Sequence, residues 1–588
     1  MAGVHPQNTE TEEPKTNNNE IEMNNSQEAK ANGTRKGEIT HELLHHEPSG
    51  WLETSLTRIK SSTGGFVSKN LASIKTIFLF VLNGIVIGYF VGCLYYYLQF
   101  VNEPLELCHG FGSLIAFLSI IYFFLLYFLI IKKYFGPWFE RHAWRYVTRF
   151  CGYFWKIVWI RWCLCLVTAG VLILFLFWDT RDSLERMVAL LGLAVILLLG
   201  FTFSSHPERV NWRSVWSGLL IQFVFGIIFI RWQPGRHALQ CFSDKVATFL
   251  TYGTEGAEFV FGKLLVRTES VFAFASLPII FYFSMIVEVL FFWGALQWFC
   301  LKLGQLLRAA THTTVCESVI AVGNIFLGNT ESILLIKPYL SLLTPSEIHV
   351  VMASGFATVS GTILAAYISF GAEPAHLVTA SVMSAPAAIC ISKLMMPETK
   401  RSLTTVDNIQ PVPSEDESAL SAATRGATNG IALVLNIIAN LVAFVSFIAF
   451  VNGFLGYCGG MLGFPGINLE WIMGKVFIPL CWLMGVPWDE CERVGSLVGL
   501  KTVVNEFVAY QRMGEMKADG LLSPRAELIA TYALCGFTNP SSAGIMIGAI
   551  AAMAPNQRET LSSIAVRAFF AGCAICFMTA CIAGMLMP

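Results

Sequence analysis

Two stretches of the sequence are similar to each other: CESVIAVGNIFLGNTES at residues 316–332 and CERVGSLVGLKTVVNEF at residues 491–507. Each begins with a Cys-Glu pair and reaches, at the same spacing, a glutamate in apolar surroundings, Glu331 in the first copy and Glu506 in the second. A segment that begins with Ser/Thr-Pro follows each copy, TPSEIHVVMASGFATVSG at residues 344–361 and SPRAELIATYALCGFTNPSSAG at residues 523–544. The sequence therefore repeats a hairpin, near residues 312–338 and 490–515, followed by an interrupted helix.

This repeated unit has a physical rationale inside a membrane. Re-entrant hairpins and partly unwound helices leave backbone N–H and C=O groups free near mid-membrane, where they persist only if they line a cavity or bind something. An ionisable side chain at that depth is costly and usually faces a polar pathway or a partner. Two glutamates at matching repeat positions therefore predict a transport site. The alternative is that they only hold helices together by hydrogen bonds.

The composition is that of an integral membrane protein. Of 588 residues, 55% are hydrophobic and 13% are charged, and the mean hydropathy is +0.59, which is too apolar for an ordinary soluble protein. Five apolar runs ahead of the repeats are each long enough to cross a bilayer as a helix: Thr76–Phe100, Phe111–Ile131, Trp162–Trp178, Met187–Phe203 and Ser214–Ile230. We predict an all-α, multi-pass (polytopic) fold built on an inverted repeat. The net charge of -1 argues against a nucleic-acid partner.

Charge and polarity also predict how the chain is divided and oriented. We expect a disordered cytoplasmic region at residues 1–70, three additional N-terminal transmembrane helices within residues 71–180, and a core of scaffold and transport domains over residues 181–588. Basic residues flank the first span on its N-terminal side and follow the second span, so the positive-inside rule makes the N-terminus cytoplasmic. The last predicted span, Ala568–Met587, ends at the C-terminus, which we expect to be extracellular.

Several motifs carry a resemblance to a known family. GNIFLGNTES, GFATVSGTILAAYISFG, LVTASVMSAPA, KTVVNEFVAY, TYALCGF and FFAGCAICFMTACIAG resemble the concentrative nucleoside transporters, sodium-coupled solute carriers of nucleosides, in their eukaryotic form. The similarity covers roughly Met187 to the C-terminus. It implies symport of nucleosides with sodium across the plasma membrane by alternating access, two re-entrant hairpins and two partly unwound helices in a transport domain, and a scaffold that forms a homotrimer.

The resemblance also implies a nucleoside site. The tip of the first hairpin would bind the nucleobase through Asn329, Thr330 and Glu331, with Gly328 beside them and Phe537 as an apolar wall. Amides and hydroxyls suit this task, because a base edge alternates donors and acceptors and a dry site penalises any that stay unpaired. The ribose would be bound by Glu506, Asn539 and Ser542.

A sodium site is implied in the same way. It would be built from Asn324 and Leu327 on the first hairpin and from Thr358 and Val359 on the following helix. Sodium is the expected coupling ion, and no cofactor is expected. Hard cations prefer oxygen ligands, and the ends of interrupted helices offer carbonyl groups that point toward the break.

Departures from the family pattern affect the expected selectivity. Asn329 stands where many members carry Gln or Met, and its shorter side chain would allow water to mediate contact with the base. Gly328 corresponds to glycine in members that accept purines and to serine in the pyrimidine-selective type, so we expect both base classes to be admitted. Pro540 replaces an isoleucine in the broken helix and would sharpen the unwinding.

Two further glutamates lie in apolar segments. We expect Glu288 to pair with a basic neighbour or face water rather than carry a proton, and Glu317 to brace the hairpin through a structural hydrogen bond.

The sequence also bears on other classes of function. The sequence has no H-E-x-x-H, Gly-x-Ser-x-Gly or phosphate-binding loop, so an enzyme is not expected. A channel would repeat a pore-lining segment across subunits instead of folding an inverted pair around a midplane site. A proton-coupled nucleoside symporter and a nucleoside sensor that does not transport remain as alternatives, because the sequence can indicate binding but not turnover.

Overall fold

The computed structural model describes residues 51–587 apart from residues 102–104, 107, 128–130, 132–166, 168–169, 171–173, 175–177, 180, 182, 405–411, 413, 415 and 465. The described part of the chain is helical and contains no β-strand, as predicted. It divides into two compact units, Met1–Pro137 and Trp138–Pro588.

The first unit contains two described helices, α2 (Trp51–Phe100) and α3 (Gly110–Leu126). The Tyr122 hydroxyl on α3 donates to Asn83 Oδ1 on α2 over 2.8 Å. The predicted first span, Thr76–Phe100, forms the apolar half of α2 and has the length of a membrane span. The expectation of disorder up to residue 70 is wrong for residues 51–70, which are helical. The predicted span Trp162–Trp178 lies almost wholly outside the described residues.

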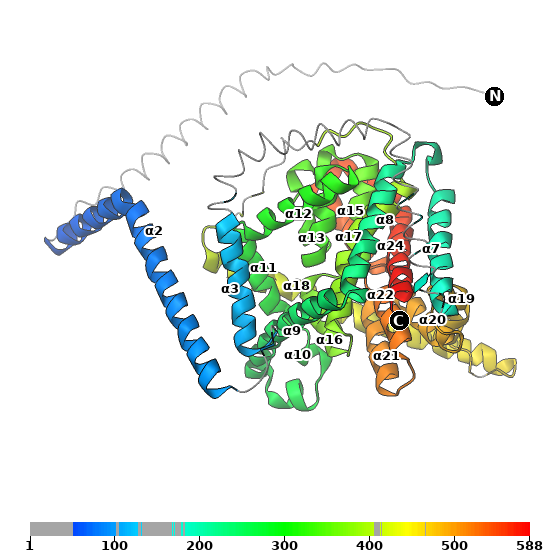
Figure 1. Ribbon diagram of the computed structural model, residues 1–588. Helices are drawn as coiled ribbons and strands as arrows, with labels where there is room; N and C mark the ends of the chain where they lie inside the picture. The colour runs from blue at the N-terminus through cyan, green and yellow to red at the C-terminus, as the bar shows by residue number, and fades with distance from the viewer. Residues whose placement is uncertain are drawn as a thin grey trace, which may run out of the picture. The chain divides into compact units, whose positions relative to one another are not determined.

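The long helices described in the second unit run from α7 to the C-terminal helix α24 (Figure 1). Its first helices are α7 (Leu184–Thr202), α8 (Trp212–Gly226), α9 (Gln233–Phe261), α11 (Ile279–Phe292) and α12 (Ala295–Thr311). Later helices outside the repeats are α17 (Pro374–Met395), α18 (Ala419–Met461), α19 (Leu469–Leu483) and α24 (Arg558–Leu586). Within the described residues of both units, eight helical segments are long and apolar enough to cross a membrane, which supports the multi-pass prediction.

The first copy of the repeated motif forms two helices that end in breaks. Helix α13 (Val315–Phe326) is followed by a turn and the short α14 (Glu331–Leu334), and α15 (Pro345–Ala357) is separated from α16 (Gly361–Ser369) by three residues. Local chemistry starts α15 where the sequence predicts: the Thr344 amide donates to Glu347 Oε2 over 2.8 Å, and the Glu347 amide donates to Thr344 Oγ1 over 3.2 Å. This capping box, with Pro345 in the first turn, satisfies N–H groups that a membrane could not solvate.

The second copy has the same order of elements. Helices α20 (Cys491–Val503) and α21 (Glu506–Ala518) form the hairpin, and α22 (Pro524–Leu534) and α23 (Pro540–Met553) flank an extended break. Asparagines restart the helices after both breaks: Asn505 Oδ1 accepts from the Val508 amide and Asn539 Oδ1 from the Ser542 amide. Pro540 is the first residue of α23, where a missing N–H costs nothing, so it bounds the unwound segment as expected.

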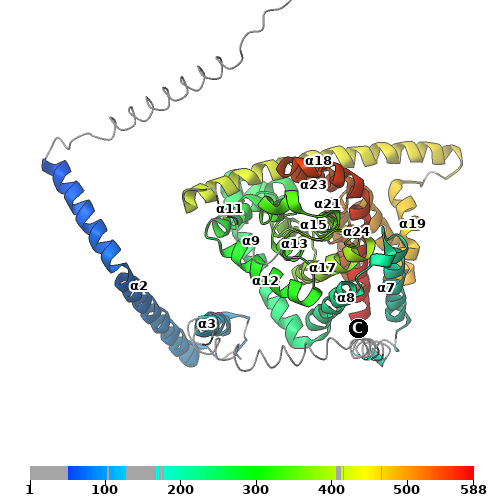
Figure 2. The same cartoon turned by 90° about the horizontal axis from the view of Figure 1, so that it is seen from above.

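Helix α18 runs along one edge of the second unit (Figure 2), where it packs against α11. Glycine makes this close approach possible, because a Cβ added at Gly426 would lie 2.5 Å from the Ser284 carbonyl oxygen and one added at Gly430 would lie 2.9 Å from the Phe281 ring. Small residues at such crossings maximise van der Waals contact, which matters in a bilayer where apolar burial gives no driving force. Helices α11 and α18 are therefore closely packed against each other.

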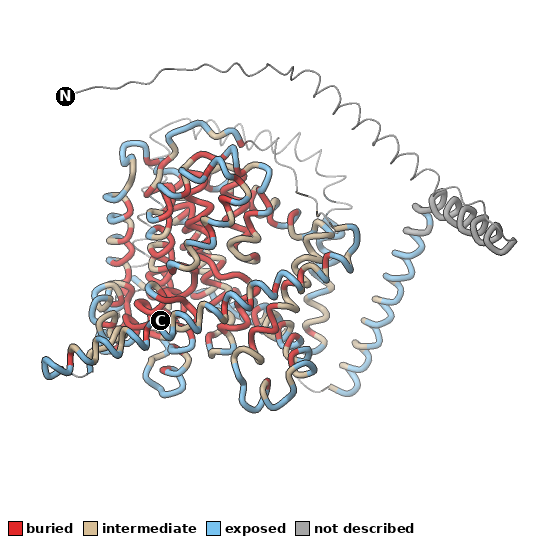
Figure 3. Tube along the Cα trace, turned by 180° about the vertical axis from the view of Figure 1, so that it is seen from behind, coloured by how far each residue is buried: buried red, intermediate tan, exposed pale blue. Residues whose placement is uncertain are grey.

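Buried residues concentrate in the repeated elements and in α17 and α24, at the centre of the second unit (Figure 3). Nearly every residue of α15 is buried, including Glu347 and His349. The breaks at residues 358–360, 504–505 and 535–539 thus lie inside the protein, as polar backbone at membrane depth requires.

Candidate nucleoside and sodium site

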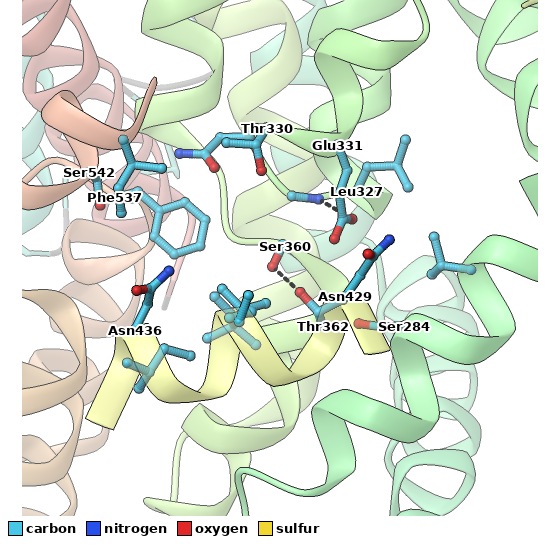
Figure 4. A pocket seen from close by; sticks show the side chains of 18 of the residues that line it. Ser284, Leu327, Thr330, Glu331, Ser360, Thr362, Asn429, Asn436, Phe537 and Ser542 are labelled. Atoms are coloured by element: carbon cyan, nitrogen blue, oxygen red, sulfur yellow. Dashed lines mark hydrogen bonds between the residues drawn. The ribbon is translucent and has the colours of Figure 1, made fainter. Parts of the chain in front are cut away.

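A cavity of about 720 Å³ lies between the two copies of the repeated motif and the α11–α18 pair. Figure 4 shows it bounded by the first hairpin tip, by Phe537 and by α18. Its lining includes every residue predicted for the base and the ribose: Gly328, Asn329, Thr330, Glu331, Phe537, Glu506, Asn539 and Ser542. Residues about two hundred positions apart in the sequence thus meet around one space, whose volume suits a small organic ligand.

At the first hairpin tip, Glu331 is the first residue of α14, and its Oε2 accepts a hydrogen bond from the Gly328 amide over 3.1 Å. A Cβ added at Gly328 would lie 3.5 Å from that carboxyl group, an ordinary contact distance. A larger side chain therefore fits here, but it would stand against the Glu331 carboxyl group. The side chain at position 328 would therefore affect the position of the Glu331 carboxylate, which faces the cavity.

At the second hairpin, Glu506 is buried and opens α21, where the positive end of the helix dipole favours a carboxylate. Asn539, at the break before α23, donates from Nδ2 to Glu506 Oε2 over 2.7 Å. The same amide group accepts from the Ser542 backbone through Oδ1 over 2.9 Å. Both ends of the Asn539 amide are therefore engaged, so Asn539 orients Glu506 in addition to lining the cavity.

Two side chains that the sequence reasoning did not single out hold the second hairpin to α22. Lys501 is completely buried, and its Nζ donates to the Ala533 carbonyl over 2.8 Å. The Tyr510 hydroxyl donates to the Thr531 carbonyl over 2.9 Å. These carbonyls lie in the last turn of α22, the negative end of its dipole, which a lysine side chain complements. Both helices of the second hairpin, α20 and α21, are thus tied to α22.

The predicted sodium residues form a buried group next to the cavity. All four, Asn324, Leu327, Thr358 and Val359, are buried, and Leu327 also lines the cavity. Asn324 Oδ1 accepts from the Ser332 hydroxyl and its Nδ2 donates to Ser354 Oγ over 2.9 Å.

Thr358 belongs to the same group, because its hydroxyl donates to the Ser354 carbonyl over 2.9 Å. Ser354 therefore links Asn324 on the first hairpin to Thr358 at the break after α15. Amide, hydroxyl and carbonyl oxygens are the ligands that a hard cation requires, so the donor set fits sodium.

The structure also places the two remaining glutamates. Glu288 pairs with Arg425 on α18 over 3.2 Å and accepts from Asn429 Nδ2 over 3.2 Å, which confirms the expected pairing with a basic neighbour. Glu317 is fully buried, pairs with Lys393, and accepts from the Thr314 amide over 2.9 Å in a capping box. Its structural role at the start of the first hairpin is confirmed.

One wall of the cavity was missed by the sequence reasoning, the polar face of α18. It contributes Arg425, Asn429, Asn436 and Asn440. The signal that could have revealed it is the spacing of Asn429, Asn436 and Asn440 within a predominantly apolar helix.

Three family models cover most of the second unit. A model described as "Na+ dependent nucleoside transporter C-terminus" matches residues 376–584, its N-terminal counterpart matches residues 191–264, and a model described as "Gate: Nucleoside recognition" matches residues 273–374. The chain belongs to the sodium-dependent nucleoside transporter family. The predicted family is thereby confirmed.

Named relatives of this transporter are solute carriers and not enzymes. "Solute carrier family 28 member 3" of Eptatretus stoutii is 40% identical over 562 residues, covering 92% of this chain and 79% of the relative. The protein of the same name from Homo sapiens is 41% identical over 446 residues, or 73% of this chain and 64% of the relative. "Sodium/nucleoside cotransporter 2" of Rattus norvegicus is 42% identical over 429 residues, or 71% and 65%.

Solved structures agree on the fold of this transporter. The structure of CNTnw in an inward-facing substrate-bound state is 34% identical, with a TM-score of 0.65 over 68% of this chain and 98% of CNTnw. A CNTnw variant in an outward-facing state matches with a TM-score of 0.66 and 33% identity, over 68% and 99% of the two chains.

Proposed function

We propose that the protein carries nucleosides into cells together with sodium, by alternating access, and that it admits both purine and pyrimidine nucleosides. The observation that carries the proposal is the cavity in which Glu331 and Glu506, the glutamates of both hairpins, lie with Asn539 and Phe537. Glu506 and Asn539, with Ser542, bind the ribose, and the Gly328–Glu331 tip and Phe537 bind the base. The relatives named as sodium/nucleoside cotransporters support the substrate class and the coupling ion.

Sodium binds in this proposal to oxygens of Asn324, Leu327, Thr358 and Val359. These residues connect the first hairpin to the break after α15, so an ion held there would set the position of the hairpin tip that binds the base. Structures of CNTnw in an inward-facing state and of its variant in an outward-facing state support alternating access as the mechanism. The pairing of Glu288 with Arg425 leaves no lone carboxylate at this position for proton coupling.

We expect sodium-dependent, electrogenic accumulation of uridine and adenosine by cells that express the protein. The measurement is uptake of each radiolabelled nucleoside with sodium present and with choline or potassium in its place, at constant pH. Accumulation against a gradient distinguishes a symporter from a channel and from a sensor, which would bind without accumulating. Unchanged uptake after sodium replacement would refute the coupling, and uptake that follows a proton gradient instead would assign it to protons.

Selectivity is predicted to depend on Gly328. In Gly328→Ser, the added Cβ fits, but the hydroxyl meets the Glu331 carboxyl group and narrows the space for a bicyclic base. We expect purine nucleosides to lose affinity by roughly three- to tenfold, about the effect of one displaced neutral hydrogen bond, with pyrimidine nucleosides little changed. Competition of adenosine and of uridine against labelled uptake measures this, with Gly328→Ala as the control without a hydroxyl. An equal loss for both classes would show that residue 328 holds the hairpin and does not select the base.

The assembly and the orientation are part of the same proposal. We propose a homotrimer in the plasma membrane with a cytoplasmic N-terminus, an extracellular C-terminus, and N-terminal helices within residues 71–180 added to a transport core at 181–588. Support comes from the multi-pass helices and from the family to which the chain belongs. Cross-linking of the purified chain and labelling of terminal tags on intact cells measure these features.

A further inference from the structure

Helix α18 carries a polar face where an apolar one would be expected. Over Ala419–Met461 it is among the most apolar segments of the described chain. Nevertheless Asn429, Asn436 and Asn440 all line the cavity. An amide exposed in an apolar span is costly unless it faces water or a ligand.

Helical geometry places the three asparagines on one face. They are spaced by seven and then four residues, and both intervals bring side chains back to the same side of an α-helix. The eleven residues from Asn429 to Asn440 correspond to roughly 16 Å along the axis. In Figure 4, Asn429 and Asn436 extend from α18 into the cavity, toward the regions where Glu331 and Phe537 lie.

The side-chain amides of Asn429, Asn436 and Asn440 differ in the hydrogen bonds that they make within the protein. Asn429 donates to Glu288, beside the Glu288–Arg425 ion pair, so part of its capacity is occupied. For Asn436 and Asn440 the described part of the chain provides no side-chain hydrogen bond, although both lie at the cavity wall. Each amide offers one acceptor and two donor hydrogens, the pairing that hydroxyls and base edges require.

We propose that Asn436 and Asn440 form a nucleoside-binding subsite on α18, across the cavity from the hairpin residues. The inference rests on the proposed function and extends it, because the substrate is then bound from two sides: by the hairpins and broken helices, and by a helix outside the repeats. Close packing of α18 on α11 at Gly426 and Gly430 holds the subsite in place. As the hairpins move, the two amides, one helical turn apart, offer the substrate successive partners along α18.

The test is a nucleoside-binding titration of the purified full chain in sodium buffer, with uptake measured in parallel. Asn436→Leu and Asn440→Leu keep a similar side-chain volume but remove the amide. Each is expected to raise Kd for uridine and adenosine by between twofold and tenfold, as for one neutral hydrogen bond, and to raise KM in the same proportion. Leu435→Ala, on the same helix but outside the cavity lining, is the matched control and should leave Kd unchanged.

The outcomes separate this subsite from the proposed function. If wild type accumulates nucleoside but both asparagine variants keep its Kd and KM, the subsite is refuted and the function stands. A fall in surface expression or kcat alone, shared with Leu435→Ala, would indicate a packing role and would also refute it. If wild type shows no sodium-dependent uptake, the proposed function fails, and the titration with the purified chain still decides whether the amides bind nucleoside.

Discussion

Replacement of Glu506 by glutamine is expected to weaken nucleoside binding by about 1.5–3 kcal/mol, the usual contribution of hydrogen bonds to a charged group. Glu506 is buried at the start of α21, and Asn539 donates to its Oε2 over 2.7 Å, which helps to orient the carboxylate. A carboxylate can accept hydrogen bonds from two adjacent ribose hydroxyls. Glutamine keeps the shape and one acceptor oxygen for Asn539, but replaces the other oxygen with a donor and removes the charge.

A substrate without those hydroxyls should already lack this contact. We therefore expect 2′,3′-dideoxynucleosides to compete poorly at wild type and to lose little more at Glu506→Gln. Glu331→Gln serves as the matched control, because that carboxyl group is held by the Gly328 amide at the other hairpin. It should alter the preference among bases and leave the penalty for missing hydroxyls intact.

A competition assay that crosses both variants with ribo- and dideoxynucleosides measures the coupling, after surface labelling has established expression. The decisive quantity is the coupling energy between the substitution and the removal of the hydroxyls. If the two losses simply add for Glu506→Gln, the carboxylate and the ribose do not touch, and the ribose assignment must be abandoned.

The sodium dependence is expected to shift most in Asn324→Leu. This substitution removes a proposed oxygen ligand, and with it the hydrogen bonds to Ser332 and Ser354 that join the first hairpin to α15. Coupling between two ligands of one protein is typically 1–3 kcal/mol, or about 5- to 150-fold. We expect the sodium concentration for half-maximal uptake to rise by roughly tenfold or more, and nucleoside affinity at low sodium to fall with it.

Ser354→Ala provides the matched control for this experiment. It removes the partner of Asn324 Nδ2 but leaves Asn324 Oδ1, the proposed ligand, in place. Its sodium activation curve should therefore move much less than that of Asn324→Leu. Equal shifts in the two variants would mean that Asn324 acts only by bracing the hairpin, and the ion would have to be bound elsewhere.

Much of the fold could be predicted from the sequence because its causes are local. Apolar length predicts spans, and the first of them, Thr76–Phe100, has the predicted bounds. The capping box of Thr344 and Glu347 and the prolines at 345, 524 and 540 begin helices through contacts within one turn. Residues 51–70 show the limit of this reasoning: a polar composition predicted disorder, but the segment continues the helix that leads into the first span.

The amino-acid sequence was enough to predict the membrane class and the family, and it predicted two hairpins with their glutamates, because apolar length, caps and motif spacing are properties of short segments. Tertiary structure alone decided which polar groups meet: Asn539 with Glu506, Lys501 with the Ala533 carbonyl, and Glu288 with Arg425. It also decided that the asparagines of α18 face a cavity and not lipid. The physical reason is that an apolar helix has no local signal for its neighbours. Only the folded structure makes one side of α18 pack against α11 and another side line the cavity opposite the hairpins.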